Sequence, residues 1–293
     1  MKFVFVILHY LATEDTIECV ESILGNLDYK NIEIIVVDNA SPNGSIDKIE
    51  NYFINNTINN KKVTIIRSEK NLGFARGNNL GFLHAKYHLS ADFIILINND
   101  TIITQKNFCQ VALDKYNEYR YYILGPDITT LDGYHQNPLI KASWSFKELK
   151  LFRLKKRIRL VCTYLKVDNL IDNFIKEVKD VHIKDRLEGD FLNTALHGAC
   201  FIFSKDYIDK FEGLNGDTFL YMEEDILKLY SDYYNFLMMY SSDLSILHKE
   251  DIATNMVSGS TIGKKRNLYR RLIESSVVYE KIKRNMSKNE INT

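Results

Sequence analysis

Three consecutive acids, Glu223, Glu224 and Asp225, form the densest run of carboxyl groups in the sequence, within FLYMEEDILKLY. Aromatic and aliphatic residues flank them, so a helix that starts there would not turn all three side chains to water. Crowding of like charges in a partly buried place raises the pKa of a carboxyl group, and a raised pKa suits a general base. The same run also fits an acid-rich helix N-terminus stabilised by the helix macrodipole.

A second group of oxygen-bearing side chains, Asn98, Asn99 and Asp100, follows the apolar run at 93–97. Mg²⁺ and Mn²⁺ prefer such ligands and usually take only one or two from protein, with water and phosphate oxygens completing the shell. His248, after the strand-like LSIL, is a candidate second ligand. Asn-Asn-Asp is also a good turn or helix cap, and a lone histidine is more often structural.

Two further loops carry candidate ligands for a nucleotide. Asp38 closes the apolar run IEIIVVD, where its carboxylate could accept hydrogen bonds from a base or a ribose, or form an Asx-turn. In NLGFARGNN (71–79), Arg76 lies between Gly73 and Gly77 at a predicted helix start. An arginine beside free backbone N–H groups can hold a phosphate, although the spacing fits neither GxGxxG nor a P-loop.

The elements that would position these residues alternate regularly along the first 130 residues. Short apolar runs rich in β-branched residues are separated by segments of helical spacing such as 75–89; these runs are 3–10, 32–38, 62–68 and 92–98. This alternation predicts an α/β fold with a mainly parallel sheet covered on both faces. Ligands bind at the carboxyl ends of such strands, so the four loops that begin at those ends are expected to converge on one pocket.

Composition excludes several classes of protein. The formal net charge is zero and 45% of residues are hydrophobic, which gives no global bias toward nucleic acid. The four cysteines are scattered without a CxxC pair, so we expect free buried thiols. The apolar N-terminal run is predicted to be a strand and not a signal peptide. A run of 18 apolar residues is absent, so a cytoplasmic protein is expected.

Two basic segments with interleaved apolar residues stand out, at 141–166 and 263–284. Each can be a solvated helix face, or the two can contact an anionic membrane surface. We divide the chain accordingly into four parts, of which the second is a basic amphipathic insertion and the fourth a basic helical C-terminal extension; their bounds are 1–135, 136–190, 191–260 and 261–293.

Four stretches together resemble the motifs of inverting family-2 glycosyltransferases with the GT-A fold. In order, they are VDNAS (37–41), NLGFARGNN (71–79), INNDT (97–101) and GACFIFSKDYIDKFEGLNGDTFLYMEED (198–225). The resemblance covers about residues 3–260 and is strongest to the branch with rhamnosyltransferases of bacterial surface-polysaccharide assembly. It implies a mainly parallel nucleotide-binding sheet flanked by helices, with a mixed acceptor-binding part. It also implies that residues 1–135 are the half that binds the nucleotide-sugar donor and that residues 191–260 are the acceptor-binding and catalytic half.

The resemblance also implies an activity and a set of site residues. A sugar would move from dTDP-rhamnose or a UDP-sugar to a hydroxyl of a glycan or lipid-linked acceptor in capsule or O-antigen assembly, at the inner face of the cell membrane. Glu224 would take the acceptor proton with Glu223 and Asp225 beside it, and Asp100 and His248 would bind Mg²⁺ or Mn²⁺. The residues implied to line the nucleotide-sugar site are Tyr10, Asp38, Asn71, Gly73, Arg76, Asn78 and Asn99.

Departures from the family pattern keep alternatives open. The metal motif has one carboxylate instead of two, and Ile226 stands where an aspartate is often found, which leaves the choice among the three acids open. A non-catalytic nucleotide-sugar or membrane-binding module therefore remains an alternative. A nucleotidyltransferase would need a glycine- and lysine-rich loop after the first strand, and HYLATEDTIE contains neither residue.

Overall fold

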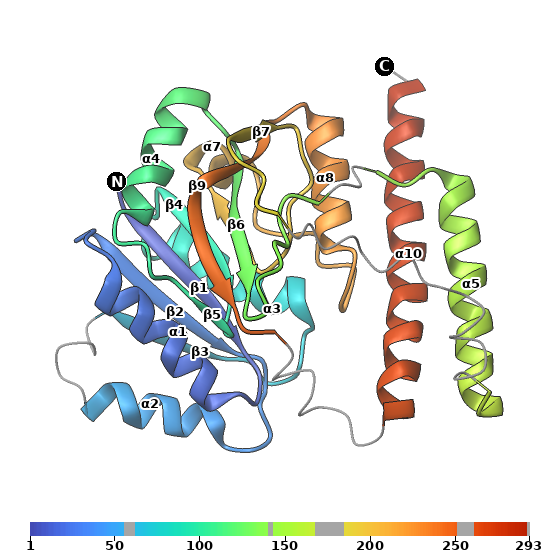
Figure 1. Cartoon of the computed structure of the whole chain (residues 1–293), viewed down its shortest axis with the longest axis horizontal. Helices are drawn as coiled ribbons and strands as arrows, with labels where there is room; N and C mark the ends of the chain where they lie inside the picture. Colours follow the sequence, from blue (N-terminus) through green and yellow to red (C-terminus); the bar gives the residue numbers. More distant parts are fainter. Residues whose placement is uncertain (56–61, 140–142, 168–184, 251–260, 292–293) are drawn as a thin grey trace.

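The computed structural model describes residues 1–55, 62–139, 143–167, 185–250 and 261–291. Within these ranges one sheet runs in the order β3-β2-β1-β4-β8-β6-β9-β5, and β7 pairs with β9 (Figure 1). The strands are β1 Phe3–His9, β2 Ile32–Asp38, β3 Val63–Arg67, β4 Phe93–Asn98, β5 Thr101–Ile102, β6 Ile123–Thr130, β7 Asp190–Leu192, β8 Cys200–Phe203 and β9 Met238–His248. The helices are α1 Thr13–Asn26, α2 Ser45–Asn55, α3 Phe74–Tyr87, α4 Phe108–Tyr119, α5 Phe146–Leu165, α7 Lys205–Lys210, α8 Glu223–Tyr234 and α10 Thr261–Ile291.

The first half of the sheet is parallel throughout. Strand β1 pairs in parallel with β2 and β4, and β2 pairs in parallel with β3. Every residue of β1 except Leu8 is buried, as expected for a strand covered on both faces. The predicted α/β fold with its four parallel strands is therefore confirmed.

The second half of the sheet is mixed. Strand β8 lies antiparallel between β4 and β6, and β6 runs parallel to β9 with a register shift between Pro126 and Asp127. The two-residue strand β5 pairs antiparallel with the end of β9, which places Thr101 opposite His248. This pairing joins residues 147 positions apart in the chain and creates one corner of the site described below.

Helices cover both faces of the sheet because successive side chains of each strand point to opposite faces. Phe3, Phe5 and Ile7 of β1 pack with residues of α1, α2 and α4 in one buried cluster. Val4 and Val6 pack on the opposite face with residues of α3, α7 and α8. The two clusters hold the strands in place between the helices. The candidate site residues follow the carboxyl ends of these strands.

The two basic segments pair with each other beyond α8. Figure 1 shows α5 (yellow-green) and α10 (red) side by side, with α8 between them and the sheet. Leu149 of α5, Ile226 of α8 and Tyr279 of α10 belong to one buried cluster. Helix α5 begins with a capping box, in which Ser145 accepts from the backbone of Glu148 and the Glu148 side chain accepts from the backbone of Ser145.

Several smaller expectations concern the same elements. All four cysteines are buried and free, as predicted. Lys141 and residues 168–184 of the predicted insertion lie outside the described residues, as do residues 251–260 after β9. Among the described helices, none combines the length and the apolar character needed to cross a bilayer.

Candidate active site

The end of β4 and the end of β9 bring Asp100 and His248 together. Nε2 of His248 lies 3.2 Å from Oδ1 of Asp100, and both side chains are almost fully buried. Oδ1 of Asp100 nevertheless has no hydrogen-bond partner within the described chain. A buried carboxylate oxygen without a partner is costly, because it has lost its hydration and gained nothing in return.

The hydrogen bonds of Gln136 show which ring nitrogen of His248 carries a proton. The carboxylate of Glu250 can only accept, so Nε2 of Gln136 donates to it and Oε1 of Gln136 points to His248. Nδ1 of His248 must then donate to that oxygen, over 2.7 Å. When the imidazole is neutral, its one proton is on Nδ1, so the lone pair of Nε2 faces Oδ1 of Asp100 across 3.2 Å.

This arrangement fits a divalent cation. A positive charge between the lone pair of His248 and the free oxygen of Asp100 would satisfy both, and an imidazole and a carboxylate are ordinary ligands for Mn²⁺. Among the described residues, no group of three His, Cys, Asp or Glu side chains gathers as a metal site. Two protein ligands leave room for phosphate oxygens and water, which is how Mg²⁺ and Mn²⁺ commonly bind.

A buried hydrogen-bond network ties the end of β1 to the end of β4. Thr16 uses its hydroxyl proton on a backbone carbonyl of its own helix, so it accepts from Nδ1 of His9 at 2.7 Å and from Nδ2 of Asn99 at 3.0 Å. Nε2 of His9 then accepts from Ser45. Burial lowers the pKa of His9 to about 4, against the opposing effect of the Asp38 charge, so the imidazole is neutral.

The predicted donor loops at the ends of β2 and β3 are joined by Asn39. Its Nδ2 donates to Oδ1 of Asn71 and to the carbonyl of Gly73, both at 3.1 Å, and its Oδ1 accepts from the backbone N–H of Leu72. Oδ1 of the neighbouring Asp38 accepts from the backbone N–H of Ser41, three residues on, which closes a turn of the loop. Both interpretations of Asp38 stay compatible, because its second carboxylate oxygen is not part of that turn.

The other residues predicted to line the nucleotide-sugar site differ in exposure and in how far their side chains are already hydrogen-bonded. Arg76 is exposed and its Nε donates to the carbonyl of Gly216 at 2.5 Å, so the loop before α8 holds its stem. Asn78 is buried and donates to the carbonyl of Phe74 one turn earlier, which uses its amide group within α3. Tyr10 is half-buried in the loop after β1.

Two of the three adjacent acids are held by neighbouring side chains. Glu223 is buried and accepts from the hydroxyl of Thr218 at 2.8 Å. Asp225 accepts from the indole N–H of Trp144 at 2.7 Å, across the contact between α8 and the segment that precedes α5. Burial raises the pKa of Glu223.

Glu224 differs from both, because its carboxylate lies against backbone. A methyl group added to Gly198 would lie 2.5 Å from Oε1 of Glu224, so only glycine leaves room for it. Burial first, and then the negative charge of Glu223, raise the pKa of Glu224 to about 8. His197 precedes Gly198, and its ring lies 5.9 Å from the ring of His248. The loop before β8 thus links Glu224 to the Asp100–His248 pair.

The turn that aims the acids is held in an unusual conformation. Tyr221 and Met222 have φ of 74° and 69°, the left-handed region that residues other than glycine rarely adopt. The carbonyl of Phe219 accepts from the backbone N–H of Phe74 at 2.8 Å, and the carbonyl of Leu220 accepts from Ser275 of α10. The donor loop on one side and α10 on the other therefore fix this turn.

Sequence reasoning missed several residues of this arrangement. Asn39 stands inside the motif VDNAS, next to Asp38, and His197 stands directly before the motif that begins at Gly198. His9 is the last residue of β1, so its position at a strand end was the available signal. Gln136 and Trp144 had no such signal, because each reaches its partner from a loop far away in the chain.

Comparisons with known proteins agree with this architecture. Residues 5–210 match the family model "Glycosyl transferase family 2", and the chain belongs to that family. A comparison of the sequence with curated proteins found no match.

Solved structures share the fold at low sequence identity. The crystal structure of TarS 1–349 from S. aureus is 14% identical, with a TM-score of 0.52 over 85% of this chain and 60% of that one. TarS 1–349 in complex with UDP is 13% identical, with a TM-score of 0.53 over 95% of this chain and 66% of that one. The crystal structure of GalNAc-T7 with UDP, GalNAc and Mn²⁺ is 11% identical, with a TM-score of 0.59 over 92% of this chain and 47% of that one. This chain thus spans less than two thirds of each of these proteins, and the shared fold is GT-A-like.

Proposed function

We propose that the protein is an inverting glycosyltransferase that moves a sugar from a nucleotide-sugar to a hydroxyl group of an acceptor. The observation that carries the proposal is the site itself: a partnerless oxygen of Asp100 facing His248, linked through the loop at Gly198 to Glu224, whose pKa is about 8. The first pair suits a diphosphate with its metal ion. The second group suits proton removal from an alcohol.

Glu224 is the general base in this proposal. Its carboxylate takes the proton of the acceptor hydroxyl as the oxygen attacks the anomeric carbon, and the bond from that carbon to the diphosphate breaks. One displacement inverts the anomeric configuration and needs no covalent nucleophile. Glu224 is favoured over Glu223 and Asp225 because those two are engaged by Thr218 and Trp144.

Asp100 and His248 would hold Mg²⁺ or Mn²⁺. When bound, the ion would supply positive charge against the negative charge that develops on the departing diphosphate. Arg76 adds a fixed positive charge at the start of α3, and Asp38 stands where a base or a ribose can be recognised. The structures of TarS with UDP and with UDP-GlcNAc, and of GalNAc-T7 with UDP and Mn²⁺, support a nucleotide-sugar and a metal at this type of site.

For the substrates we propose dTDP-rhamnose or a UDP-sugar as donor and a glycan or lipid-linked intermediate as acceptor, at the cytoplasmic face of the membrane. The motifs that resemble the rhamnosyltransferase branch of polysaccharide assembly support this choice.

The test is release of nucleoside diphosphate from a panel of UDP-, dTDP- and GDP-sugars with Mn²⁺, with and without simple glycoside acceptors. We expect turnover of one donor by the wild type, and a loss of about a hundredfold or more in Asp100→Ala and in Glu224→Gln. Glu274→Gln, on the exposed side of α10, is the matched control and should turn over normally.

The two variants should also separate in calorimetry with UDP and dTDP. Asp100→Ala should weaken Mn²⁺-dependent binding of the nucleotide, whereas Glu224→Gln should leave it unchanged. Binding by the wild type without turnover of any donor, with every acceptor tried, would instead support the non-catalytic binding module.

A further inference from the structure

Helix α5 turns a continuous apolar stripe to solvent. Its five members are each between 45% and 65% exposed: Leu151, Leu154, Ile158, Val161 and Leu165. Their spacing alternates between three and four residues, which places them on one line along the helix. The opposite side of α5 is buried, with Leu149 and Thr163 facing inward. Exposed leucines are ordinary one at a time, but a stripe of five is not.

Lysine and arginine border this stripe on both sides. At 100° per residue, Lys155 lies along one edge, and Lys150 and Arg157 lie along the other; all three side chains are exposed. An apolar stripe edged by cations is the arrangement of helices that lie in the headgroup region of a bilayer. The apolar side chains enter the acyl boundary, and the cations meet lipid phosphates.

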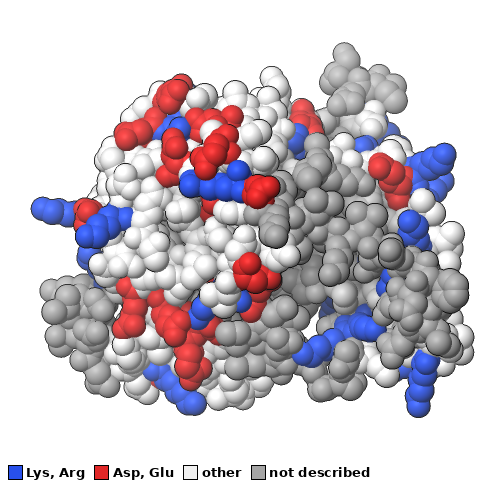
Figure 2. All heavy atoms as spheres, in the orientation of Figure 1, with Lys and Arg blue, Asp and Glu red and all other residues white. Residues whose placement is uncertain are grey.

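The charge of the helix pair is opposite to that of the rest of the chain. Helices α5 and α10 carry sixteen lysines and arginines against four glutamates, in a protein whose formal net charge is zero. The remainder of the chain is therefore negative by the same twelve charges. In Figure 2 the acidic side chains gather over the sheet, and basic ones predominate on the side where α5 and α10 lie. An anionic surface would attract this side selectively.

The same charges argue against a second copy of the chain as the partner of the stripe. A three-four spacing is also that of a coiled-coil seam, whose flanking positions meet across the interface. In a pair of α5 helices those flanks would bring Lys150, Lys155 and Arg157 against one another in either orientation. Like charges at these positions oppose association, whereas anionic lipid would relieve the repulsion.

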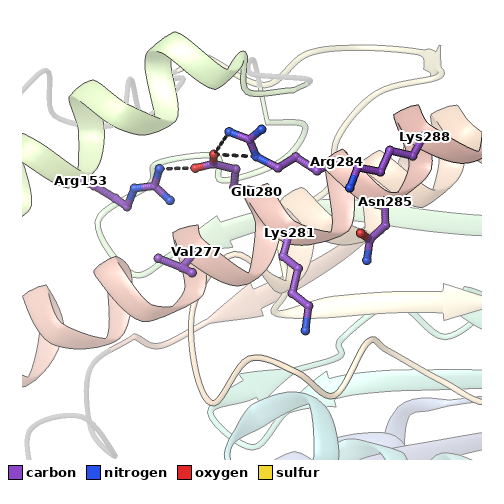
Figure 3. Close-up of a pocket in the computed structure, with 7 residues that line it drawn as sticks. All are labelled: Arg153, Val277, Glu280, Lys281, Arg284, Asn285 and Lys288. Carbon is purple, nitrogen blue, oxygen red and sulfur yellow. Dashed lines mark hydrogen bonds and ion pairs between the residues drawn. The ribbon is translucent and has the colours of Figure 1, made fainter.

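Contacts to α10 fix the inward side of α5, so the stripe stays outward. Figure 3 shows Glu280 of α10 between Arg153 of α5 and Arg284 of α10. The ion pair of Arg153 with Glu280 joins the two helices, and Arg284 holds Glu280 from within α10. The hollow of about 290 Å³ beside this cluster is also lined by Lys281 and Lys288. It lies along the edge of α5 that carries Lys150 and Arg157, and so adds further cations to that flank.

We infer that α5 docks the protein on an anionic lipid bilayer, with the stripe of Leu151, Leu154, Ile158, Val161 and Leu165 inserted below the headgroups. The sequence left two interpretations of the basic segments open, solvated helix faces or contact of both segments with an anionic membrane, and this inference narrows the second one to α5. In α10, Tyr279 and Met286 are buried against α5 and α8, so α10 supports the docking helix from behind. The inference concerns a surface apart from the catalytic residues and does not depend on the proposed function.

The experiment is co-sedimentation of the full chain with vesicles of phosphatidylcholine, alone or mixed equally with phosphatidylglycerol. We expect binding to the anionic vesicles that weakens with added salt, and little binding to the neutral ones. The double variant Leu154→Glu with Ile158→Glu should lower the partition coefficient at least about tenfold. Its matched control is Leu131→Glu with Leu192→Glu, two exposed leucines outside α5, which should bind as the wild type does.

A second pair of variants tests the cationic edges. Lys150→Gln with Arg157→Gln should lower binding to anionic vesicles by roughly tenfold or more, and Lys30→Gln with Lys48→Gln, on the sheet side, should not. Two results would overturn the inference. One is an equal loss of vesicle binding in the two lysine and arginine double variants, and the other is normal vesicle binding by Leu154→Glu with Ile158→Glu.

Two measurements in solution exclude the other occupants of the stripe. The stripe variant should keep the melting temperature of its control, and sedimentation velocity should give the same mass for wild type and variant. A large drop in melting temperature would mean that the stripe is covered within the chain, and a wild-type dimer lost in the variant would assign it to a second copy; either result rejects the inference. Donor turnover, measured without vesicles, reports separately on the proposed function.

Discussion

At the scale of single residues, the start of α8 shows how three neighbouring acids acquire different surroundings. Thr218 donates to Glu223 and Trp144 donates to Asp225, whereas Glu224 lies on the backbone at Gly198. Burial beside another carboxylate leaves Glu224 with a pKa of about 8, close to the pH at which a base must act.

This pKa predicts how activity depends on pH. A base must be deprotonated, so kcat/KM, which reports the free enzyme, should rise about tenfold per pH unit below pH 8 and level off above it. Glu224→Gln should lack this rise and retain only a small residual rate. A wild-type kcat/KM that stays flat from pH 6 to pH 9 would show that Glu224 does not act as the base.

The same group predicts an effect on stability that needs no substrate. The pKa of Glu224 is higher in the folded chain than the usual value of 4.5, so folding is favoured when Glu224 is protonated, and this contribution is lost as pH rises from about 4.5 through 8. Glutamine cannot ionise. The melting temperature of Glu224→Gln should therefore gain on that of the wild type between pH 5 and pH 8, and an unchanging difference would contradict the assigned environment.

The sequence indicated the acid cluster and its raised pKa, but it could not single out Glu224, which we propose as the base. The run Glu223-Glu224-Asp225 between apolar residues was enough to expect burial and repulsion. The choice depends on Trp144, which is 81 residues away from Asp225 in the chain, and on the absence of a side chain at Gly198. Contacts of this kind arise from tertiary packing, which no local pattern encodes.

At the scale of elements, the loop before α3 and the turn before α8 form one unit. Gly73 has φ of +80°, and a methyl group added to it would lie 2.1 Å from the carbonyl oxygen of Phe219. That same carbonyl accepts from the backbone N–H of Phe74. A side chain at residue 73 would therefore push apart the predicted donor loop and the turn that aims Glu224.

Gly73→Ala and Gly133→Ala together isolate this contact. Gly133 has a nearly equal φ of +83° and nothing within 4 Å of an added methyl group, so alanine there should cost only the backbone strain, about 1 kcal/mol. Gly73→Ala should cost about 2 kcal/mol more in urea unfolding because of the clash. It should also reduce donor turnover more than Gly133→Ala does. Equal stability of the two variants would mean that the loop and the turn move independently.

The parallel strands were predictable from sequence, whereas the strands that complete the site were less so. Buried strands such as Ile32–Asp38 are nearly continuous apolar runs, which is the strongest signal a strand can give. Strand β5 has two residues, and its pairing with His248 depends on long-range register. The position of His248 after an apolar run was visible, but its contact with Asp100 was implied only by resemblance to a family.

At the scale of the whole molecule, charge is separated although the net charge is zero. The α5–α10 pair is strongly positive and the rest of the chain is equally negative. Sequence showed the two basic segments but not that they lie side by side, which brings their charges together on one part of the molecule (Figure 1). A molecule of this kind presents different surfaces to different charged partners, whatever its isoelectric point.

This separation predicts that the protein is retained at low salt on a cation exchanger at pH 7, its approximate isoelectric point. Added salt should release it as the charges are screened. The triple variant Lys150→Glu, Lys155→Glu and Arg157→Glu should elute at clearly lower salt. A matched triple variant on the sheet side, with glutamate at Lys30, Lys48 and Lys70, changes the net charge equally and should shift elution much less. If both triple variants shifted the eluting salt concentration equally, net charge alone would govern adsorption, and the positive face would not bind the exchanger as a separate surface.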